Sequence, residues 1–181
     1  MQVFILCTGR SGSSTFIKAC KCITNFSSGH ETRIKKTGDA RFAFPENHIE
    51  ADNRLSWFLG ALENKYGDSA FYVHLIRNRE ATINSFNSRW KNKGSIVKAF
   101  SESILYSPTL FQTQKDKENI CGFYVDTVNT NIEMFLKNKT HKMIIHLEKI
   151  GKEFPQFWNA IHAEGDLKKA TSELRIKHNR S

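Results

Sequence analysis

No apolar run in this sequence approaches the ~20 residues that a membrane-spanning helix needs, so we expect no transmembrane segment. Residues 2–7 are too short for the apolar core of a signal peptide, and no basic segment precedes them. The cysteines are few and match neither the spacing of a disulfide framework nor that of a zinc site: Cys7, Cys20, Cys22 and Cys121. We therefore expect reduced thiols, no metal site and a cytoplasmic protein.

Acidic residues are also fewer than basic ones. Lys and Arg total 27 residues against 18 Asp and Glu, which gives a formal net charge of +9 at pH 7. This excess indicates an anionic partner, and charge alone is compatible with nucleic acid, an anionic membrane face or a polyanionic small molecule. With 181 residues, of which 39% are hydrophobic, we expect one compact soluble domain that covers residues 1–181.

Short apolar runs alternate with segments of helical periodicity. The runs at 2–7, 71–76 and 142–147 predict β-strands, and the first two are nearly continuous in apolar residues, as strands covered on both faces are. Apolar residues at three- to four-residue spacing predict helices at 13–22, 52–66, 80–90 and 120–136. This alternation predicts an α/β fold, a three-layer sandwich with a central parallel sheet.

Two segments do not fit the alternation. Residues 32–50 are polar and basic, and residues 90–118 contain a polar run, with a short helix expected at 95–105. Excursions of this kind in an α/β domain are typically substrate loops or lids, although ordinary mobile surface loops would give the same pattern.

The first predicted strand leads into a Gly- and Ser-rich stretch, Gly9–Thr15, at the start of a predicted helix. Free N–H groups and the positive end of the helix dipole favour a phosphate or sulfate there. The stretch is not a Walker A loop, because only two residues separate Gly9 from Gly12, no Lys follows Gly12, and the cation, Arg10, precedes it. Alternatively, the stretch could bind no ligand and be only a tight turn in which a Ser or Thr caps the helix.

A second anion-binding pair follows the second predicted strand. Arg77 would emerge at the carboxyl end of a parallel strand, where open α/β sheets bind ligands, and Ser85 would lie about two turns into the next helix. A guanidinium and a hydroxyl so placed can hold a second, separate phosphate. Taken alone, they could equally be a surface arginine and an exposed serine.

Together, the two motifs resemble the sulfotransferases that use 3′-phosphoadenosine 5′-phosphosulfate (PAPS) and release 3′-phosphoadenosine 5′-phosphate (PAP). Arg10 to Ser14 match the family's 5′-phosphosulfate loop, Arg77 and Ser85 match its 3′-phosphate motif, and His146-Leu147-Glu148 is a weaker third match. The resemblance implies a P-loop NTPase-like sulfotransferase fold, PAPS as donor and no metal. It also implies a set of cofactor-binding residues: Gly9, Arg10, Ser11, Gly12, Ser13, Ser14, Thr15, Arg77 and Ser85. The family's C-terminal Arg-Lys-Gly signature is absent.

The same resemblance suggests catalytic residues. A cation at the position of Arg10 stabilises charge on the departing phosphate and on the sulfuryl oxygens. Glu31 is our candidate for the general base, because several sulfotransferases place a catalytic Glu in a similar region. His30 is the rival, since cytosolic members use His, and Glu31 could also be a solvated loop residue.

The acceptor is expected to be the hydroxyl or amine of a small molecule or carbohydrate, with no nucleic acid partner. Arg33, Arg41, Phe42 and Trp57 could line its pocket, or Trp57 could simply pack a helix against the sheet. Arg89, Trp90 and Lys91 could flank the adenosine. Three other functions stay open: a P-loop nucleotide or small-molecule kinase, a non-catalytic basic module that binds polyanions, and a PAP-binding fold without catalysis. The sequence does not fix the acceptor or the oligomeric state.

Overall fold

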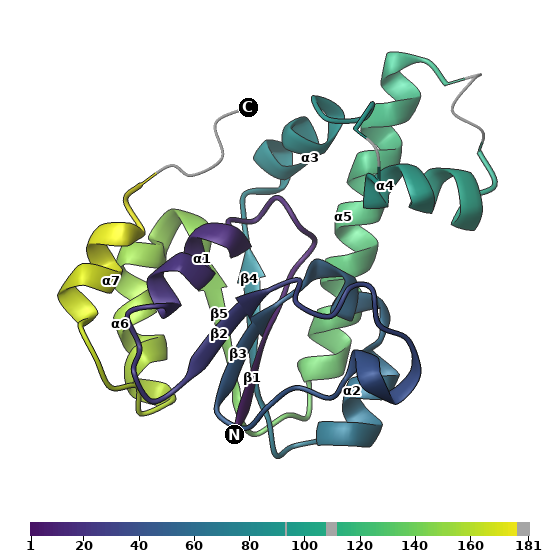
Figure 1. Ribbon diagram of the computed structural model, residues 1–181. Helices are drawn as coiled ribbons and strands as arrows, with labels where there is room; N and C mark the ends of the chain where they lie inside the picture. Colours follow the sequence, from purple (N-terminus) through teal and green to yellow (C-terminus); the bar gives the residue numbers. More distant parts are fainter. Residues whose placement is uncertain (93, 108–111, 177–181) are drawn as a thin grey trace.

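The computed structural model describes residues 1–92, 94–107 and 112–176. Its middle layer is a five-stranded sheet in the order β2-β3-β1-β4-β5, with every neighbouring pair parallel (Figure 1). The strands are β1 Gln2–Leu6, β2 Ser27–His30, β3 His48–Ala51, β4 Phe71–Ile76 and β5 Lys142–His146. Because all strands run the same way, their carboxyl ends lie at one edge of the sheet, which is where ligands bind in such folds.

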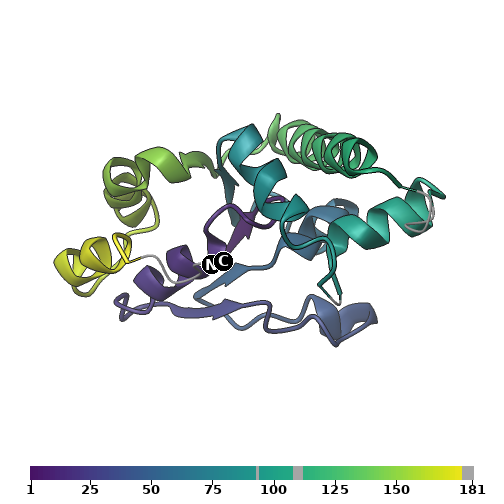
Figure 2. The same ribbon diagram turned by 90° about the horizontal axis from the view of Figure 1, so that it is seen from above.

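Helices cover both faces of the sheet (Figures 1 and 2). One face carries α1 Ser13–Cys20, α6 Ile150–Ala160 and α7 Leu167–Glu173. The other carries α2 Leu59–Tyr66, α3 Arg79–Asn87, α5 Gln114–Leu136, the short α4 Ile96–Ala99 and the π-helix Phe100–Ile104. The predicted three-layer α/β architecture with a central parallel sheet is confirmed.

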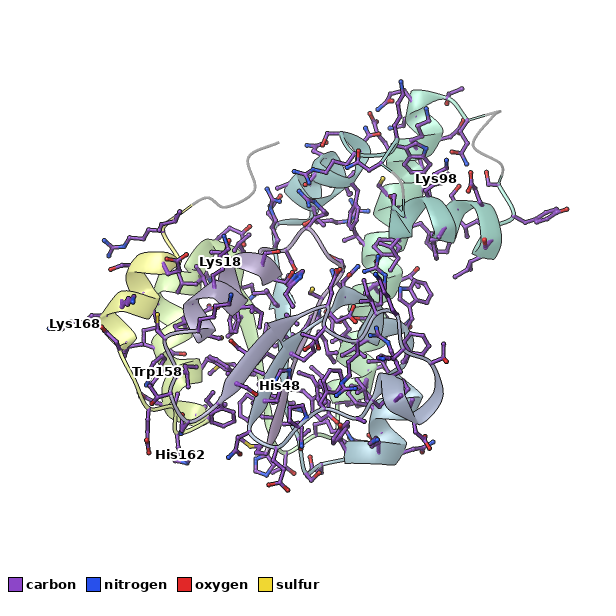
Figure 3. The ribbon with its side chains drawn as sticks, in the orientation of Figure 1. Lys18, His48, Lys98, Trp158, His162 and Lys168 are labelled. Atoms are coloured by element: carbon purple, nitrogen blue, oxygen red, sulfur yellow. The ribbon has the colours of Figure 1, made fainter. Side chains whose placement is uncertain are left out.

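The strand β1 divides the core in two. Its alternate residues point to opposite faces, so Val3 and Ile5 pack in the layer of α1, α6 and α7, while Phe4 and Leu6 pack against α5. All four side chains are fully buried. Aromatic rings fill the first layer: Phe16 lies 5.2 Å from Phe154 and 5.1 Å from Phe157 between ring centroids, and Trp158, labelled in Figure 3, is buried there as well.

The three predicted strands are confirmed to within one residue, but the segment 32–50 is not wholly a loop. It contains the start of β3, which pairs with β1 and with β2. Its polar residues His48 and Glu50 are buried against each other, so β3 lacks the apolar run by which the other strands were recognised. His48, labelled in Figure 3, begins this strand.

The helix predicted at 52–66 is in fact two pieces. A 3₁₀-helix covers Asn53–Trp57, where the Asp52 carboxylate caps the N–H of Arg54 at 2.9 Å, and α2 begins only at Leu59. The first predicted helix ends at Cys20 rather than at residue 22.

The segment 90–118 is also more ordered than predicted. It contains the short α4 and the π-helix, in agreement with the helix expected at 95–105, and the first turn of α5. The helix α5 begins at Gln114 because Thr113 and Asp116 form a reciprocal capping box before it. Part of this segment, 93 and 108–111, lies outside the described residues.

The helices α6 and α7 were not predicted. Ile150, Phe154, Phe157 and Trp158 have helical spacing and are all buried, so the signal for α6 was present despite the interruption at Pro155. Over residues 1–92, 94–107 and 112–176, none of the helices has both the length and the apolar character that crossing a membrane requires.

The packing of α6 gives a stability prediction. Phe154→Ala should lower the free energy of unfolding by about 3–5 kcal/mol, because the ring is fully buried between Phe16, Phe157 and Trp158. Phe123→Ala, at a side chain that is 55% exposed, should cost about 1 kcal/mol or less. Urea unfolding of both variants measures the difference, and equal losses would contradict this description of the core.

Candidate functional site

The loop after β1 has a left-handed backbone at three positions. Gly9, Arg10 and Gly12 have φ angles of 82°, 58° and 88°. The conformation is ordinary for glycine but carries strain for Arg10, and such strain is concentrated at functional sites. The turn leads into α1, whose first turn contains no acidic residue and whose N-cap, Gly12, supplies no side-chain hydrogen bond. The N–H groups of Ser13, Ser14 and Thr15 are therefore available to an anion.

Contacts from three other elements hold this loop in place. Ser56 Oγ donates to the carbonyl of Cys7 at 3.1 Å, and Tyr124 Oη donates to the carbonyl of Thr8 at 2.9 Å. Both glycines are tightly covered: a Cβ on Gly9 would lie 2.9 Å from Asn53 Nδ2, and one on Gly12 would lie 2.5 Å from Leu147 Cδ1. The loop is thus a fixed cradle whose shape requires glycine at both positions.

The cradle is joined to α3 and to the residues that precede it. Arg77 follows β4 directly, and its Nη1 donates to the carbonyl of Arg10 at 3.0 Å. Arg10 Nε in turn donates to Ser85 Oγ at 3.0 Å. The structure therefore brings together Arg10, Arg77 and Ser85, which are up to 75 residues apart in sequence. Because Ser85 accepts from Arg10, its O–H remains available to donate to a ligand.

The electrostatics of this junction favour an anion. Partial burial lowers the pKa of Arg10, and the positive charges of Arg89 and Arg77 lower it further. Among the described residues, none of these three arginines forms an ion pair with a carboxylate. Partly buried guanidinium groups without a counter-charge are costly unless a ligand supplies it.

The end of β2 approaches the cradle from the other side. His30 Nε2 lies 3.0 Å from Ser13 Oγ and 3.2 Å from Ser14 Oγ, so this ring contacts the first turn of α1 directly. The next residue, Glu31, has a left-handed backbone with φ 54° and forms an ion pair with Arg54, with Oε1 and Nη1 3.1 Å apart. Of the two candidate bases, His30 therefore contacts the cradle, and Glu31 is the partly exposed residue that follows it.

A buried polar network fixes the turn at Glu31. The carboxylate of Glu50 accepts the N–H and the O–H of Thr32, each at 2.7 Å, and contacts His48 Nε2 at 2.9 Å. Glu31 itself donates its N–H to the carbonyl of Ala51 at 3.0 Å. The position of Glu31 is thus set by β3, the strand that the sequence did not predict.

The residues suggested for an acceptor pocket are engaged in contacts within the protein. Arg41 is buried and paired with Asp52, and Phe42 packs on Phe58 with centroids 5.9 Å apart. Trp57 packs between Phe100 and Tyr124, at 5.8 and 6.2 Å, which agrees with the packing alternative. Arg33 is occupied by a hydrogen bond to the carbonyl of Ala40.

Several site residues were not recognised from the sequence. No sequence motif marks these residues, and they lie in segments that the sequence predicted as ordinary helix: Asn53, Arg54, Ser56 and Tyr124.

A polar hollow of about 350 Å³ lies beside Arg77. It is lined by Ile76, Asn78, Arg79, Asp126, Asn129, His146 and Glu148. The segment His146-Leu147-Glu148, the weaker third sequence match, contacts the residue after Arg77, because Glu148 accepts the N–H of Asn78 at 2.8 Å.

The cysteines form no disulfide among the described residues. All four cysteines are free thiols, and burial raises the pKa of Cys7 and of Cys20. Within the part of the chain that the structure describes, no group of three or more His, Cys, Asp or Glu side chains is arranged to hold a metal ion.

Comparison with known proteins identifies the fold. No protein-family profile matches the sequence, and no curated protein matches it in sequence. Among solved structures, it is similar to the crystal structure of mouse sulfotransferase SULT7A1 complexed with PAP, with a TM-score of 0.56 and 15% sequence identity. The similarity covers 99% of this chain and 60% of that one, so this chain spans about three-fifths of its length. The chain has a sulfotransferase fold, in agreement with the resemblance of its motifs.

The cradle gives a second stability prediction. Gly12→Ala should destabilise the protein by about 1–3 kcal/mol, because alanine is strained at φ 88° and its Cβ would overlap the side chain of Leu147. Gly60→Ala is the matched control, since nothing lies within 4 Å of the added methyl group and the site is in a helix. The control should stay within about 1 kcal/mol of the wild type in urea unfolding. A Gly12→Ala variant as stable as this control would show that the cradle is not rigid.

Proposed function

We propose that this protein is a PAPS-dependent sulfotransferase. The observation that carries the proposal is the junction of Arg10, Arg77 and Ser85 at the open N-terminus of α1, where no carboxylate of the described residues pairs with either guanidinium group. The junction offers two anion-binding surfaces on either side of Arg10, one on α1 and one on α3. A nucleotide with phosphates at two separate positions matches this arrangement, and the sulfotransferase fold supports it.

The residues divide between the two phosphates. The N–H groups of Ser11 to Thr15, with the hydroxyls of Ser13 and Ser14, would hold the 5′-phosphosulfate. Arg77 and Ser85 would hold the 3′-phosphate. Two observations support the fit: the uncapped helix start, and the absence, among the described residues, of a carboxylate paired with Arg10 or Arg77.

The transfer itself is an in-line displacement at sulfur. The acceptor oxygen or nitrogen forms a bond to sulfur while the bond from sulfur to the bridging phosphate oxygen breaks, and that electron pair leaves with PAP. Arg10 would stabilise the charge that develops on the leaving oxygen. Positioning and electrostatics should supply most of the rate, by analogy with phosphoryl transfer.

The proton of the acceptor is assigned to Glu31. Its partly exposed carboxylate lies one residue beyond His30, which contacts the cradle, and Arg54 holds one of its oxygens, so the other can accept a proton. His30 is engaged with the hydroxyls of Ser13 and Ser14, which suits it better to supporting the donor site. The acceptor is a small molecule or carbohydrate with a hydroxyl or amine.

Donor binding is tested by calorimetric titration. PAP should bind the wild type with micromolar or tighter affinity, and ADP with Mg²⁺ should not match it. Arg77→Ala should weaken PAP binding roughly 10- to 100-fold, because a charge-assisted hydrogen bond contributes about 1.5–3 kcal/mol.

Arg79→Ala is the control for this titration, since Arg79 is already paired with Asp126 on the protein surface. It should retain wild-type affinity for PAP. A folded wild-type sample that fails to bind PAP would overturn the proposal, and binding of ADP with Mg²⁺ alone would indicate a kinase.

The role of Glu31 is tested by separating binding from transfer. Glu31→Gln should leave PAP affinity within about twofold while lowering PAPS-dependent sulfation of a responsive acceptor by roughly 10²- to 10⁴-fold, the usual contribution of a general base. His30→Ala should instead weaken PAP binding, because it removes the ring that contacts Ser13 and Ser14. The reverse result, with binding lost in Glu31→Gln and only transfer lost in His30→Ala, would assign the base to His30. Acceptor panels of phenols, sugars and lipid alcohols, scored by release of PAP, provide the assay.

A further inference from the structure

The site contains a third guanidinium that its motifs do not include. Arg89 lies just beyond α3, four residues after Ser85, where hydrogen bonds from Ser88 to Asn84 and from Arg89 to Phe86 continue the helical turn. Residues four apart on a helical turn lie on the same side, so Arg89 extends the surface on which Ser85 meets Arg10. In both views, α3 stands next to the loop that follows β1 (Figures 1 and 2).

The charge of Arg89 reaches the site. It lowers the pKa of Arg10 more than Arg77 does, although Arg77 is hydrogen-bonded to the main chain of Arg10. Arg89 is itself partly buried, and its neighbour Trp90, only 5% exposed, anchors the turn in the core. Arg89 is therefore held near Arg10 by the packing of the chain.

Nothing in the described protein balances this charge. No hydrogen bond or ion pair joins the side chain of Arg89 to a carboxylate among the described residues. Three guanidinium groups that are partly withdrawn from water repel each other, and the repulsion is relieved when an anion binds between them. The planar, bidentate guanidinium group is well suited to phosphate.

We propose that Arg89 is a phosphate-binding residue that makes this site selective for nucleotides with two separate phosphates over those with one. The proposal rests on the proposed function. Because Arg89 lies one helical turn after Ser85, we assign it to the phosphate held by Arg77 and Ser85, the 3′-phosphate of PAP. The nucleotide 5′-AMP, which lacks that phosphate, gains nothing from Arg89.

The experiment is a set of calorimetric titrations with PAP and with 5′-AMP at one fixed ionic strength. Arg89→Ala should weaken PAP binding roughly 10- to 100-fold and change 5′-AMP binding by about threefold or less. Arg89→Lys should fall between the wild type and Arg89→Ala, because lysine keeps the charge but not the bidentate geometry. Lys65→Ala removes a positive charge at an exposed side chain in the last turn of α2, away from the carboxyl edge of the sheet, and should leave both affinities unchanged.

Thermal unfolding without ligand separates a binding role from a structural one. If Arg89 is held against like charges, Arg89→Ala should unfold at or above the wild-type temperature, whereas a structural residue would lower it. Unchanged PAP affinity in Arg89→Ala, or equal weakening of PAP and 5′-AMP, would overturn the inference while leaving the proposed function in place. Failure of the wild type to bind PAP would instead overturn the proposed function and this inference with it.

Discussion

Arg10 joins two distant parts of the chain through a pair of hydrogen bonds, from Arg77 to its carbonyl and from its own Nε to Ser85, each 3.0 Å long. The first requires the left-handed backbone of Arg10, which turns its carbonyl towards the end of β4. The second aligns α3 with the start of α1. Together they place the first turn of α1 beside Arg77 and Ser85, the two surfaces proposed to bind anions, and the geometry of the whole site depends on this junction.

The core makes that junction rigid. Tyr124, Ser56 and Asn53 hold the loop after β1 from the α5 side of the sheet, and Leu147 closes over Gly12. At the neighbouring edge, the Glu50 network fixes the turn that carries Glu31. A preorganised site of this kind stabilises charge without reorganising, which is what the proposed sulfuryl transfer would require.

The sequence predicted those strands and motifs that can be recognised from residues close together in the chain. Apolar runs predicted β1, β4 and β5. Arg77 and Ser85 were paired because they follow a predicted buried strand, downstream of the loop after β1, at the spacing of a known motif. The sequence did not predict β3, because a strand of buried polar residues has no apolar signature and depends on its partners across the sheet. Arg54 and Tyr124 were missed for the same reason: their contacts are tertiary, and Tyr124 is 116 residues from Thr8. Arg41 and Trp57, which were suggested for an acceptor pocket, are engaged inside the protein by Asp52 and by Tyr124, and for Trp57 this agrees with the packing alternative.

The central claim is that the junction at Arg10 separates two phosphate sites of one nucleotide, and a crystal structure of the protein with PAP tests it most directly. The account predicts the 5′-phosphate on the N–H groups of Ser13 to Thr15 and the 3′-phosphate between Arg77 and Ser85, with the Arg10 side chain between them. A nucleotide bound away from the first turn of α1, or one whose 3′-phosphate contacts neither Arg77 nor Ser85, would contradict it.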